Sequence, residues 1–446
     1  MELRELQNIY FVGIGGIGMS ALARYFRHLG REVSGYDKVE TALTKQLVKE
    51  GAQVSYVDDV ALLPSKIDLV IYTPAIPDTH QQLTYLREQG YPIKKRAEVL
   101  GIISKHKKTI GVAGTHGKTT TSSILTHLLR VGEINCTAFL GGIAGNINSN
   151  FVAGTSEWVV MEADEFDRSF LQLYPQIGVI TSMDADHLDI YGVVEQLEES
   201  FEAFAGQVKE TLYVANGLPL KMKDAARYSY GLEEGQVKAT NFRAVAPQVY
   251  FDWEGFGEQW CDLEFTLAGQ HNVWNATAAI AIAYQLGIRE AAVREGLKTF
   301  KGIKRRFELV YEGETQVYID DYAHHPTELE AAIKAARALY PNRHLTGVFQ
   351  PHLYSRTQDF AAGFAAALDG LDRVLLLDIY PARELPIEGV DSSIIYKAMK
   401  NKEKVLLTKD NLLAHLETLE TEILMTLGAG DIGTMVGEVA ALLKNR

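Results

Sequence analysis

A glycine-rich segment that contains a lysine and two threonines is the part of this sequence best suited to binding phosphate. Residues 111–120 run GVAGTHGKTT, between an apolar strand-like stretch and a stretch with helical spacing. Successive backbone N–H groups and the Lys118 ammonium would converge on phosphate oxygens, and the Thr119 hydroxyl can hold Mg²⁺. The usual spacing has glycine where this chain has Val112, so we predict a variant loop for a nucleoside triphosphate, with an ordinary glycine-rich turn as the alternative. The predicted contacts are Gly114, Thr115, His116, Gly117, Lys118, Thr119 and Thr120.

A second glycine-rich segment lies near the start of the chain. Residues 13–20, GIGGIGMS, follow an apolar stretch, and Asp37 comes about twenty residues later, as in dinucleotide-binding loops. In such loops glycines let the backbone approach a pyrophosphate, and the acidic residue meets a ribose. A UDP-sugar also presents a pyrophosphate and a ribose. The pattern therefore predicts a diphosphate-linked ligand, either NAD or a UDP-sugar, with a purely structural turn as the alternative.

Acidic residues follow two apolar stretches downstream of the phosphate loop. Glu162 opens the segment EADEFD at 162–167, and His187 lies in DADHLD at 184–189. Carboxylates at neighbouring strand ends beside a phosphate loop would form an oxygen-rich site for Mg²⁺. We predict Glu162 and His187 as metal ligands together with Thr119. An acid-rich helix N-terminus is the alternative for either segment.

Polar residues also gather in the last third of the chain. Residues 320–328, DDYAHHPTE, combine two acids, a tyrosine and two histidines, and Pro326 suits a first helical turn. Residues 349–357, FQPHLYSRT, would bring His352 and Arg356 to the same edge of a sheet. We predict a functional cluster at this edge.

Two further segments give weaker signals. Residues 271–275, HNVWN, open a helical stretch whose polar residues could face an adenine and a ribose, although asparagine is also a routine capping residue. Arg305 and Arg306 stand at a boundary between two blocks of the chain. Adjacent arginines are usually solvated, but an arginine at a hinge can also reach phosphate.

Strand-like and helix-like stretches alternate along the chain, which predicts an α/β protein with mainly parallel sheets. Strands are expected at 9–13, 32–37, 68–73, 109–113, 158–163, 177–182, 316–320, 344–349, 373–378 and 422–427. Between 231 and 266, alternating segments with several glycines indicate antiparallel hairpins. The charged stretch at 105–108 is expected to be a linker between the first two of three blocks, with a solvated loop that binds no partner as the alternative.

Composition limits the possible partners. The 446 residues suffice for two to four domains, and 23% charged with 47% hydrophobic residues is ordinary for soluble globular proteins. A net charge of −13 argues against a nucleic acid or an anionic membrane as partner. The two cysteines are far apart, no signal-peptide pattern precedes the first strand, and no apolar run reaches transmembrane length. We therefore expect a cytoplasmic protein.

Motifs along nearly the whole chain resemble the Mur ligases of peptidoglycan synthesis. They are GIGGIGMS, GTHGKTTT, EADEFDRSF, DADHLDIYG, HNVWNATAA, RRFE, DDYAHHPTE, FQPHLYSRT and LGAGDI. The resemblance implies a Rossmann-like UDP-sugar-binding domain at 1–106 and a central P-loop ATPase-type α/β domain with added antiparallel strands at 107–302. It also implies a Rossmann-like C-terminal domain at 303–446 that closes over an amino acid. The implied partners are small molecules, namely ATP, UDP-N-acetylmuramate and L-alanine, with Mg²⁺ as cofactor. The protein itself is expected to be a monomer or a homodimer.

The resemblance also gives each site residue an expected role. The implied catalytic residues are Lys118, Tyr322, His324 and Arg356. Further implied ATP contacts are His271, Asn272, Asn275, Arg306 and Asp321. The implied UDP-sugar contacts are Gly15, Gly16, Ile17, Gly18 and Met19, with Asp37 as the candidate ribose contact. The chain has Leu353 where the family often has arginine, so one cation that could meet the alanine carboxylate or the phosphate is missing.

The implied reaction is ATP-driven amide formation. The γ-phosphoryl group would pass to the lactyl carboxylate of UDP-N-acetylmuramate, and the alanine amine would then attack the acyl phosphate. A ligase that adds a preformed peptide to the same sugar is the alternative within the family. A nicotinamide-dependent oxidoreductase would leave GTHGKTT without a role, and a non-catalytic nucleotide sensor would not need the cluster at 320–328.

Overall fold

The computed structural model describes residues 3, 5–184, 191, 193–220, 226–382 and 384–445. The chain forms two compact units. The first comprises Met1–Lys238, Glu254–Glu258 and Asn275–Gly296, and the second comprises Ala239–Trp253, Gln259–Trp274 and Leu297–Arg446. No described helix has both the length and the apolar character needed to cross a membrane.

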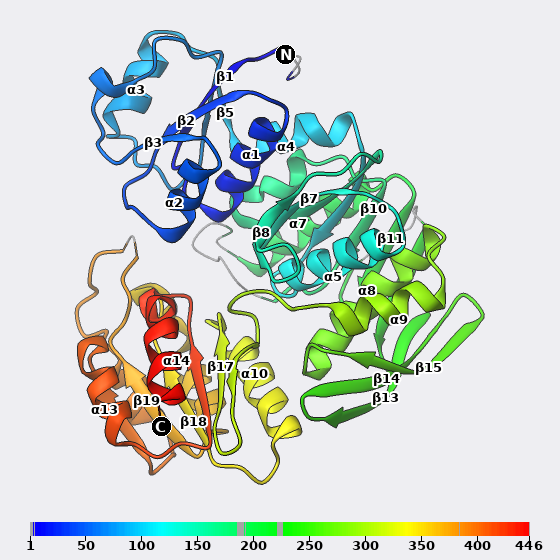
Figure 1. The fold of residues 1–446 in the computed structure, drawn as a ribbon, viewed down its shortest axis with the longest axis vertical. Coiled ribbons are helices and arrows are strands. Elements are labelled where there is room, and N and C mark those ends of the chain that lie inside the picture. Colours follow the sequence, from blue (N-terminus) through cyan, green and yellow to red (C-terminus); the bar gives the residue numbers. More distant parts are fainter. Residues whose placement is uncertain are drawn as a thin grey trace. The chain divides into compact units, whose positions relative to one another are not determined.

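The N-terminal sheet of the first unit is fully parallel. Its strands are β1 (Asn8–Val12), β2 (Glu32–Tyr36), β3 (Gln53–Ser55), β4 (Leu69–Tyr72) and β5 (Ile93–Lys95), in the order β3-β2-β1-β4-β5. The accompanying helices are α1 (Ile17–His28), α2 (Ala42–Lys49), the short η1 (Val60–Leu62), α3 (Gln81–Glu88) and α4 (Arg96–Lys105). The strand order reverses between β1 and β4, and helices lie on both faces of the sheet (Figure 1). Ligands of such sheets bind in the crevice at the reversal point, where the GIGGIGMS loop follows β1.

The central sheet of the first unit is mostly parallel. It contains β6 (Lys108–Ala113), β7 (Thr137–Ala144), β8 (Ser149–Val152), β9 (Trp158–Ala163), β10 (Ile177–Ile180), β11 (Thr211–Ala215) and β12 (Ala226–Leu232). Their order is β12-β11-β10-β6-β9-β7-β8, and only β8 pairs antiparallel within this run of strands. Helices α5 (Lys118–Val131) and α7 (Val194–Gln207), the short η2 (Phe166–Gln172), α8 (Gln270–Gln285) and α9 (Glu290–Thr299) belong to the same part of the sequence.

The central strands are apolar because helices cover both of their faces. All four residues of β10 are buried, as are five of the six residues of β6. The charged stretch at 105–108 spans the end of α4 at Lys105, a two-residue connection and the start of β6 at Lys108, and its role as a linker between blocks stays a prediction. Lys105 and Lys108 lie at the ends of the two elements, and His106 and Lys107 connect them.

The second unit begins with two hairpins. Strands β13 (Val237–Val245), β14 (Gln248–Gly255) and β15 (Glu258–Phe265) are neighbours in that order, and two-residue connections of this kind join antiparallel strands. The predicted hairpins between 231 and 266 are therefore confirmed.

The C-terminal sheet has the order β16-β17-β21-β18-β19-β20. Its strands are β16 (Glu308–Glu312), β17 (Val317–Asp321), β18 (Leu345–Phe349), β19 (Arg373–Leu377), β20 (Lys404–Leu407) and β21 (Ile423–Leu427). Strand β16 is antiparallel to β17 and the others are parallel. The helices are α10 (Pro326–Leu339), α11 (Tyr354–Leu368), α12 (Ser393–Ala398), α13 (Leu412–Thr418) and α14 (Val436–Lys444), with the short η3 (Lys409–Asn411) and η4 (Asp431–Met435).

The fold class is confirmed as α/β with three sheet regions. Each of the predicted domain ranges contains one of these regions, but the exact boundaries at 106 and 302 stay predictions. The predicted strands agree with the observed ones to within about two residues at each end, which is ordinary variation for strand assignment.

Candidate functional site

Two glycines shape the phosphate loop between β6 and α5. Gly114 has φ +136°, and a Cβ added there would lie 2.0 Å from the Thr181 Oγ1 atom. Gly117 has φ +81°, and a Cβ there would lie 2.5 Å from the Asn275 Oδ1 atom of α8. Positive φ and close approach both require glycine. The loop is therefore fixed in shape, and it brings the predicted adenosine contact Asn275 against its own backbone.

Lys118 is the first residue of α5, and its ammonium group is held inside the loop. The Nζ atom donates to the Gly114 carbonyl at 2.6 Å and to the two carboxylate oxygens of Glu165 at 3.0 and 2.7 Å. Burial alone would lower the pKa of Lys118, but the charges of Glu165 and its acidic neighbours outweigh burial and raise that pKa. Lys118 is therefore cationic at neutral pH.

Glu165 is the buried counterion of Lys118. Its side chain is only 1% exposed. Burial raises the pKa of Glu165 to about 7, although Lys118 acts in the opposite direction. A carboxylate this far from water is stable only beside a cation or hydrogen-bond donors. The pair therefore keeps the lysine charge at the loop without exposing it to solvent.

Residues that follow β10 support the loop from the side. The Ser182 Oγ atom accepts the His116 N–H at 2.7 Å and hydrogen-bonds with Thr115 Oγ1 at 2.9 Å. Thr115 Oγ1 also accepts the Asp184 N–H at 3.0 Å, and His116 Nε2 lies 3.3 Å from an Asp184 oxygen. These contacts hold two of the predicted ATP contacts in the loop conformation.

Oxygen atoms of Thr119 and Glu162 meet at the N-terminus of α5. The Thr119 hydroxyl donates to Glu162 Oε2 at 2.9 Å, and the same oxygen accepts the Gly141 N–H at 2.8 Å. A hydroxyl and a carboxylate beside a phosphate loop are the donor types that suit Mg²⁺. His187, the third predicted ligand, lies outside the described residues. Within the described part of the chain, no group of three or more acidic, histidine or cysteine side chains forms a metal site.

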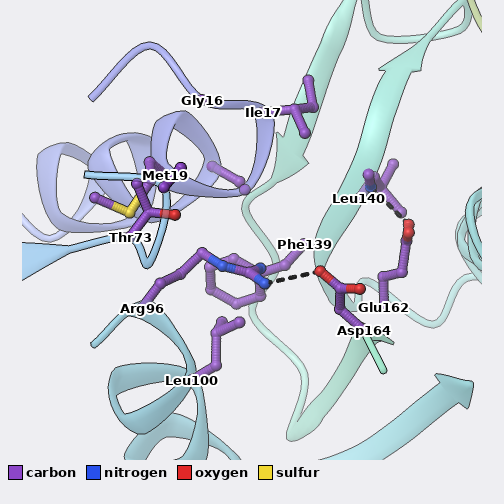
Figure 2. Close-up of a pocket in the computed structure, with 14 residues that line it drawn as sticks. Gly16, Ile17, Met19, Thr73, Arg96, Leu100, Phe139, Leu140, Glu162 and Asp164 are labelled. Atoms are coloured by element: carbon purple, nitrogen blue, oxygen red, sulfur yellow. Dashed lines mark hydrogen bonds and ion pairs between the residues drawn. The ribbon is translucent and has the colours of Figure 1, made fainter. Parts of the chain in front are cut away.

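A pocket of about 300 Å³ lies between the GIGGIGMS loop and Glu162 (Figure 2). Its lining includes the predicted UDP-sugar contacts Gly16, Ile17, Gly18 and Met19. Phe139, Leu140 and Gly141 of β7 line the other side, together with Glu162 of β9 and Asp164 just after that strand. The structure thus brings four of the six predicted UDP-sugar residues and a predicted metal ligand to one cavity of the first unit.

Asp37 lies against the glycine loop, at the end of β2. Its Oδ2 atom accepts the Gly15 N–H at 2.7 Å. A Cβ at Gly15 would lie 2.8 Å from the same oxygen. Asp37 therefore fixes the loop in addition to any contact it makes with a ribose.

The predicted cluster at 320–328 lies at the carboxyl end of β17 in the second unit. Asp321 accepts the Phe307 N–H at 2.6 Å and the Ala323 N–H at 2.7 Å. Burial raises the pKa of Asp321 to about 7, with Arg306 acting against it. Its neighbour Asp320 is fully buried and pairs with Arg305 at 3.1 Å. One aspartate therefore holds two chain segments together, and the other anchors an arginine.

Tyr322, His324 and Glu328 form the partly buried side of this cluster. The Arg305 and Arg306 guanidinium carbons each lie 5.1 Å from the centre of the Tyr322 ring. His324 Nδ1 is 3.1 Å from Glu328 Oε2, and Glu328 also lies 3.8 Å from Arg306. Cationic, aromatic and imidazole groups thus converge at one strand end, and their functional role stays a prediction.

Several other predicted residues belong to the second unit. Asn272 donates to the Ala268 carbonyl at 2.6 Å, so its amide supports the start of α8. Burial lowers the pKa of His271 to about 4, with Glu328 opposing and Arg306 adding to the effect, so this imidazole is neutral at pH 7. Arg356 is buried in the first turn of α11, and the His352 ring stacks on Tyr380 at 5.8 Å.

Sequence reasoning did not assign roles to several residues of the first unit. Glu165 belongs to the acidic segment EADEFD, but only Glu162 was selected from it. Arg96, which lines the pocket, stands in a stretch with no motif around it. Thr181 and Ser182 follow a strand as ordinary polar residues. Their importance comes from neighbours far away in the sequence, so composition around them carries no signal.

Family models match three consecutive parts of the chain. They are the Mur ligase family catalytic domain at residues 8–108, the Mur ligase middle domain at 112–283 and the Mur ligase glutamate ligase domain at 305–438. The chain belongs to the Mur ligase family.

Individual proteins are similar to this chain over nearly its full length. The chain is 48% identical to UDP-N-acetylmuramate–L-alanine ligase of Flavobacterium johnsoniae, with 99% of each chain covered. The crystal structure of UDP-N-acetylmuramate–alanine ligase MurC from Thermotoga maritima is 29% identical, with a TM-score of 0.87 and coverage of 99% and 100%. A murein peptide ligase from Psychrobacter arcticus, 22% identical over 99% of each chain with a TM-score of 0.72, shares the fold.

Proposed function

We propose that this Mur ligase joins L-alanine to the lactyl carboxylate of UDP-N-acetylmuramate while ATP is cleaved to ADP and phosphate. Likeness to a ligase of that name in F. johnsoniae, 48% identical along the whole chain, carries the proposal. The first unit supports it with a phosphate loop and a neighbouring pocket lined by the second glycine-rich loop. A cytoplasmic location and a monomeric or homodimeric state stay predictions.

In this proposal Lys118 and the start of α5 bind the ATP phosphates. The ammonium group would neutralise negative charge that moves onto bridging and terminal oxygens during phosphoryl transfer. Asn275, which lies against Gly117, would contact the adenosine. Because Lys118 is paired with Glu165, its charge is already in position before phosphate arrives.

Thr119 and Glu162 are the described residues that fit a magnesium ion. Their oxygens lie 2.9 Å apart at the start of α5. When bound there, Mg²⁺ would offset the charge of the phosphate oxygens. Glu162 also lines the pocket beside the GIGGIGMS loop, so the acid is shared between the proposed ATP and UDP-sugar sites.

The cluster of the second unit would serve the amino acid and the acyl phosphate. Tyr322, His324 and Arg356 are the proposed contacts, with Arg306 and Asp321 toward the nucleotide. His324 hydrogen-bonds through Nδ1 with the Tyr322 carbonyl at 3.0 Å, so the orientation of its ring is fixed. Excluding water from this cluster would protect the acyl phosphate from hydrolysis.

The alternative is a ligase that adds a preformed peptide to the same sugar. A relative of that kind shares the fold at 22% identity, whereas the alanine ligase is 48% identical. Phosphate release from Mg-ATP and UDP-N-acetylmuramate, measured with L-alanine, glycine, L-serine or a tripeptide as acceptor, separates them. We expect L-alanine to give the highest kcat/KM, and preference for the tripeptide would favour the alternative.

The order of chemical steps can be tested in the same assay. If phosphoryl transfer precedes amine attack, ADP forms with UDP-N-acetylmuramate and without an amino acid, up to about one equivalent per enzyme. Borohydride should then trap the acyl phosphate as an alcohol. ADP formation that strictly requires alanine, with no trapped product, would favour a concerted route.

A further inference from the structure

Arg96 is the single cation among the described residues that line the 300 Å³ pocket (Figure 2). The other charged groups of the lining are the carboxylates of Glu162 and Asp164. Under the proposed function, this cavity receives a UDP-sugar that carries a diphosphate and a carboxylate. An anion of this kind needs a local cation, because the chain as a whole is strongly acidic.

The glycine loop offers few of its own N–H groups to a diphosphate. The N–H groups of Gly13 and Ile14 donate to the Tyr36 carbonyl at 2.8 and 3.0 Å. The Gly15 N–H donates to Asp37, and the Gly16 N–H to the Gly13 carbonyl at 3.3 Å. Four successive donors are thus used inside the N-terminal sheet region. A diphosphate at this loop would instead bind the N–H groups of the first turn of α1 and a side chain that lies over that turn.

Arg96 is the side chain that lies over this turn. A Cβ added to Gly18, in the first turn of α1, would lie 2.7 Å from Arg96 Nη1 and 3.1 Å from its Cδ. The glycine therefore makes room for the guanidinium group. On its other side, Arg96 Nη2 donates to Asp164 Oδ2 at 3.2 Å (Figure 2). Arg96 is thus held between the start of α1 and the segment that follows β9.

We propose that Arg96 binds the diphosphate of the UDP-sugar, and that Asp164 is the positioning residue that holds Arg96 at the loop. This inference rests on the proposed function. A guanidinium group presents several N–H donors in a planar fork, so it can bind phosphate oxygens while keeping a contact with a carboxylate. The fork would complement the positive end of α1, which already favours an anion.

The test compares ligands that differ by one phosphate. Dissociation constants of UDP and UMP are measured by calorimetry for the wild type, Arg96→Ala and Arg96→Lys. We expect Arg96→Ala to reduce the preference for UDP over UMP by about tenfold or more, as for loss of a charge-assisted hydrogen bond. Arg96→Lys should fall between, because it keeps the charge and loses the fork. Each ratio is taken on one protein sample, so partial unfolding of a variant cancels.

Lys95→Ala is the matched control. Lys95 is the neighbouring cation, pairs with Asp167 at 2.8 Å and is absent from the described lining of the pocket. Its substitution should leave the preference for UDP over UMP unchanged. An equal loss in both variants would mean that the effect is one of general charge, which overturns the assignment to Arg96.

A second ligand pair separates the two anionic groups of the substrate. UDP-N-acetylmuramate and UDP-N-acetylglucosamine share the diphosphate and differ in the lactyl carboxylate. If Arg96→Ala alters the ratio of their affinities but not the UDP to UMP ratio, Arg96 binds the carboxylate and the proposal is wrong. Ligation by the wild type is measured in parallel, and its failure would contradict the proposed function. If the wild type ligates but the UDP to UMP affinity ratio is the same in Arg96→Ala as in the wild type, only this inference is contradicted.

Discussion

Glu165 of the first unit and Asp321 of the second are both buried carboxylates, yet they are stabilised by different partners. Burial raises the pKa of each to about 7. Glu165 binds the Lys118 ammonium through both of its oxygens. Asp321 binds two backbone N–H groups, those of Phe307 and Ala323. One carboxylate is thus held by a side chain that has a proposed catalytic role, and the other by the chain itself.

Glu165 therefore holds a charged side chain in place, whereas Asp321 links two segments of the backbone. Lys118 can exchange one anionic partner for another without any change of the backbone, so its pairing with Glu165 is compatible with phosphate binding. The partners of Asp321 cannot move unless the segments around Phe307 and Ala323 move. We therefore expect substitutions around Glu165 to affect activity first, and substitutions of Asp321 to affect stability first.

Removal of the Lys118 charge should have the largest effect. Lys118→Ala is expected to reduce kcat by about a hundredfold or more, because a preorganised charge of this kind contributes about 3 kcal/mol to the transition state. Steady-state phosphate release measures the loss, and thermal unfolding should show an intact fold. Lys108→Ala is the control, since Lys108 opens β6 and pairs with the exposed Glu157. Full activity of Lys118→Ala would contradict the ATP assignment of the loop.

Glu162→Gln should have the next largest effect, on the metal requirement. The amide keeps one oxygen for the Thr119 hydroxyl but loses the negative charge that suits Mg²⁺. The magnesium concentration for half-maximal activity should rise by about tenfold, as for loss of one charged ligand contact of about 1.4 kcal/mol. Metal titrations at saturating ATP measure this shift. A change in UDP affinity alone, with an unaltered metal titration, would place Glu162 in the UDP-sugar site only.

The sequence predicts the first-unit site better than its supporting contacts. Strands such as β9 and β10 are buried on both faces and therefore appear as continuous apolar runs, and the loops that follow them are marked by glycine, lysine and acids. Pairing of Lys118 with Glu165 could not be predicted, because it depends on the order of β6 and β9 in the sheet. The charges at 105–108 mark a boundary between two elements, because α4 ends at Lys105 and β6 begins at Lys108.

The cluster at 320–328 was predicted from its composition, but the contacts of Asp321 were not. An aspartate that follows a strand can bind a ligand or cap a turn, and both leave the same sequence pattern. The Phe307 N–H that it binds is 14 residues away, across a β-strand. Leu353 is a similar case. In the structure Leu353 is buried and has φ +69°, so it packs within a turn. The sequence shows only that a cation is missing at this position.

The smallest expected effect concerns the pH dependence of stability, and it compares Asp321 with Asp372. Burial raises the pKa of Asp321, so between about pH 4 and 7 the folded protein binds a proton that the unfolded chain has released. Stability due to this group therefore falls as pH rises. Asp321→Asn should be less stable than the wild type by about 1 kcal/mol near pH 4.5, because the amide nitrogen cannot accept the N–H that the second carboxyl oxygen accepts. The difference should narrow toward pH 8.

Asp372 should show the opposite sign. Partial burial would raise the pKa of Asp372, but the Leu345 N–H and Arg337 outweigh it and lower that pKa. Stability due to Asp372 is therefore present at neutral pH and disappears as pH falls through the folded-state pKa. Urea unfolding of Asp321→Asn, Asp372→Asn and the wild type at pH 4.5, 6 and 8 measures both trends. If the two variants deviated from the wild type with the same pH trend, Asp321 would not be a buried acid held by backbone N–H groups, and its contrast with Glu165 would fail.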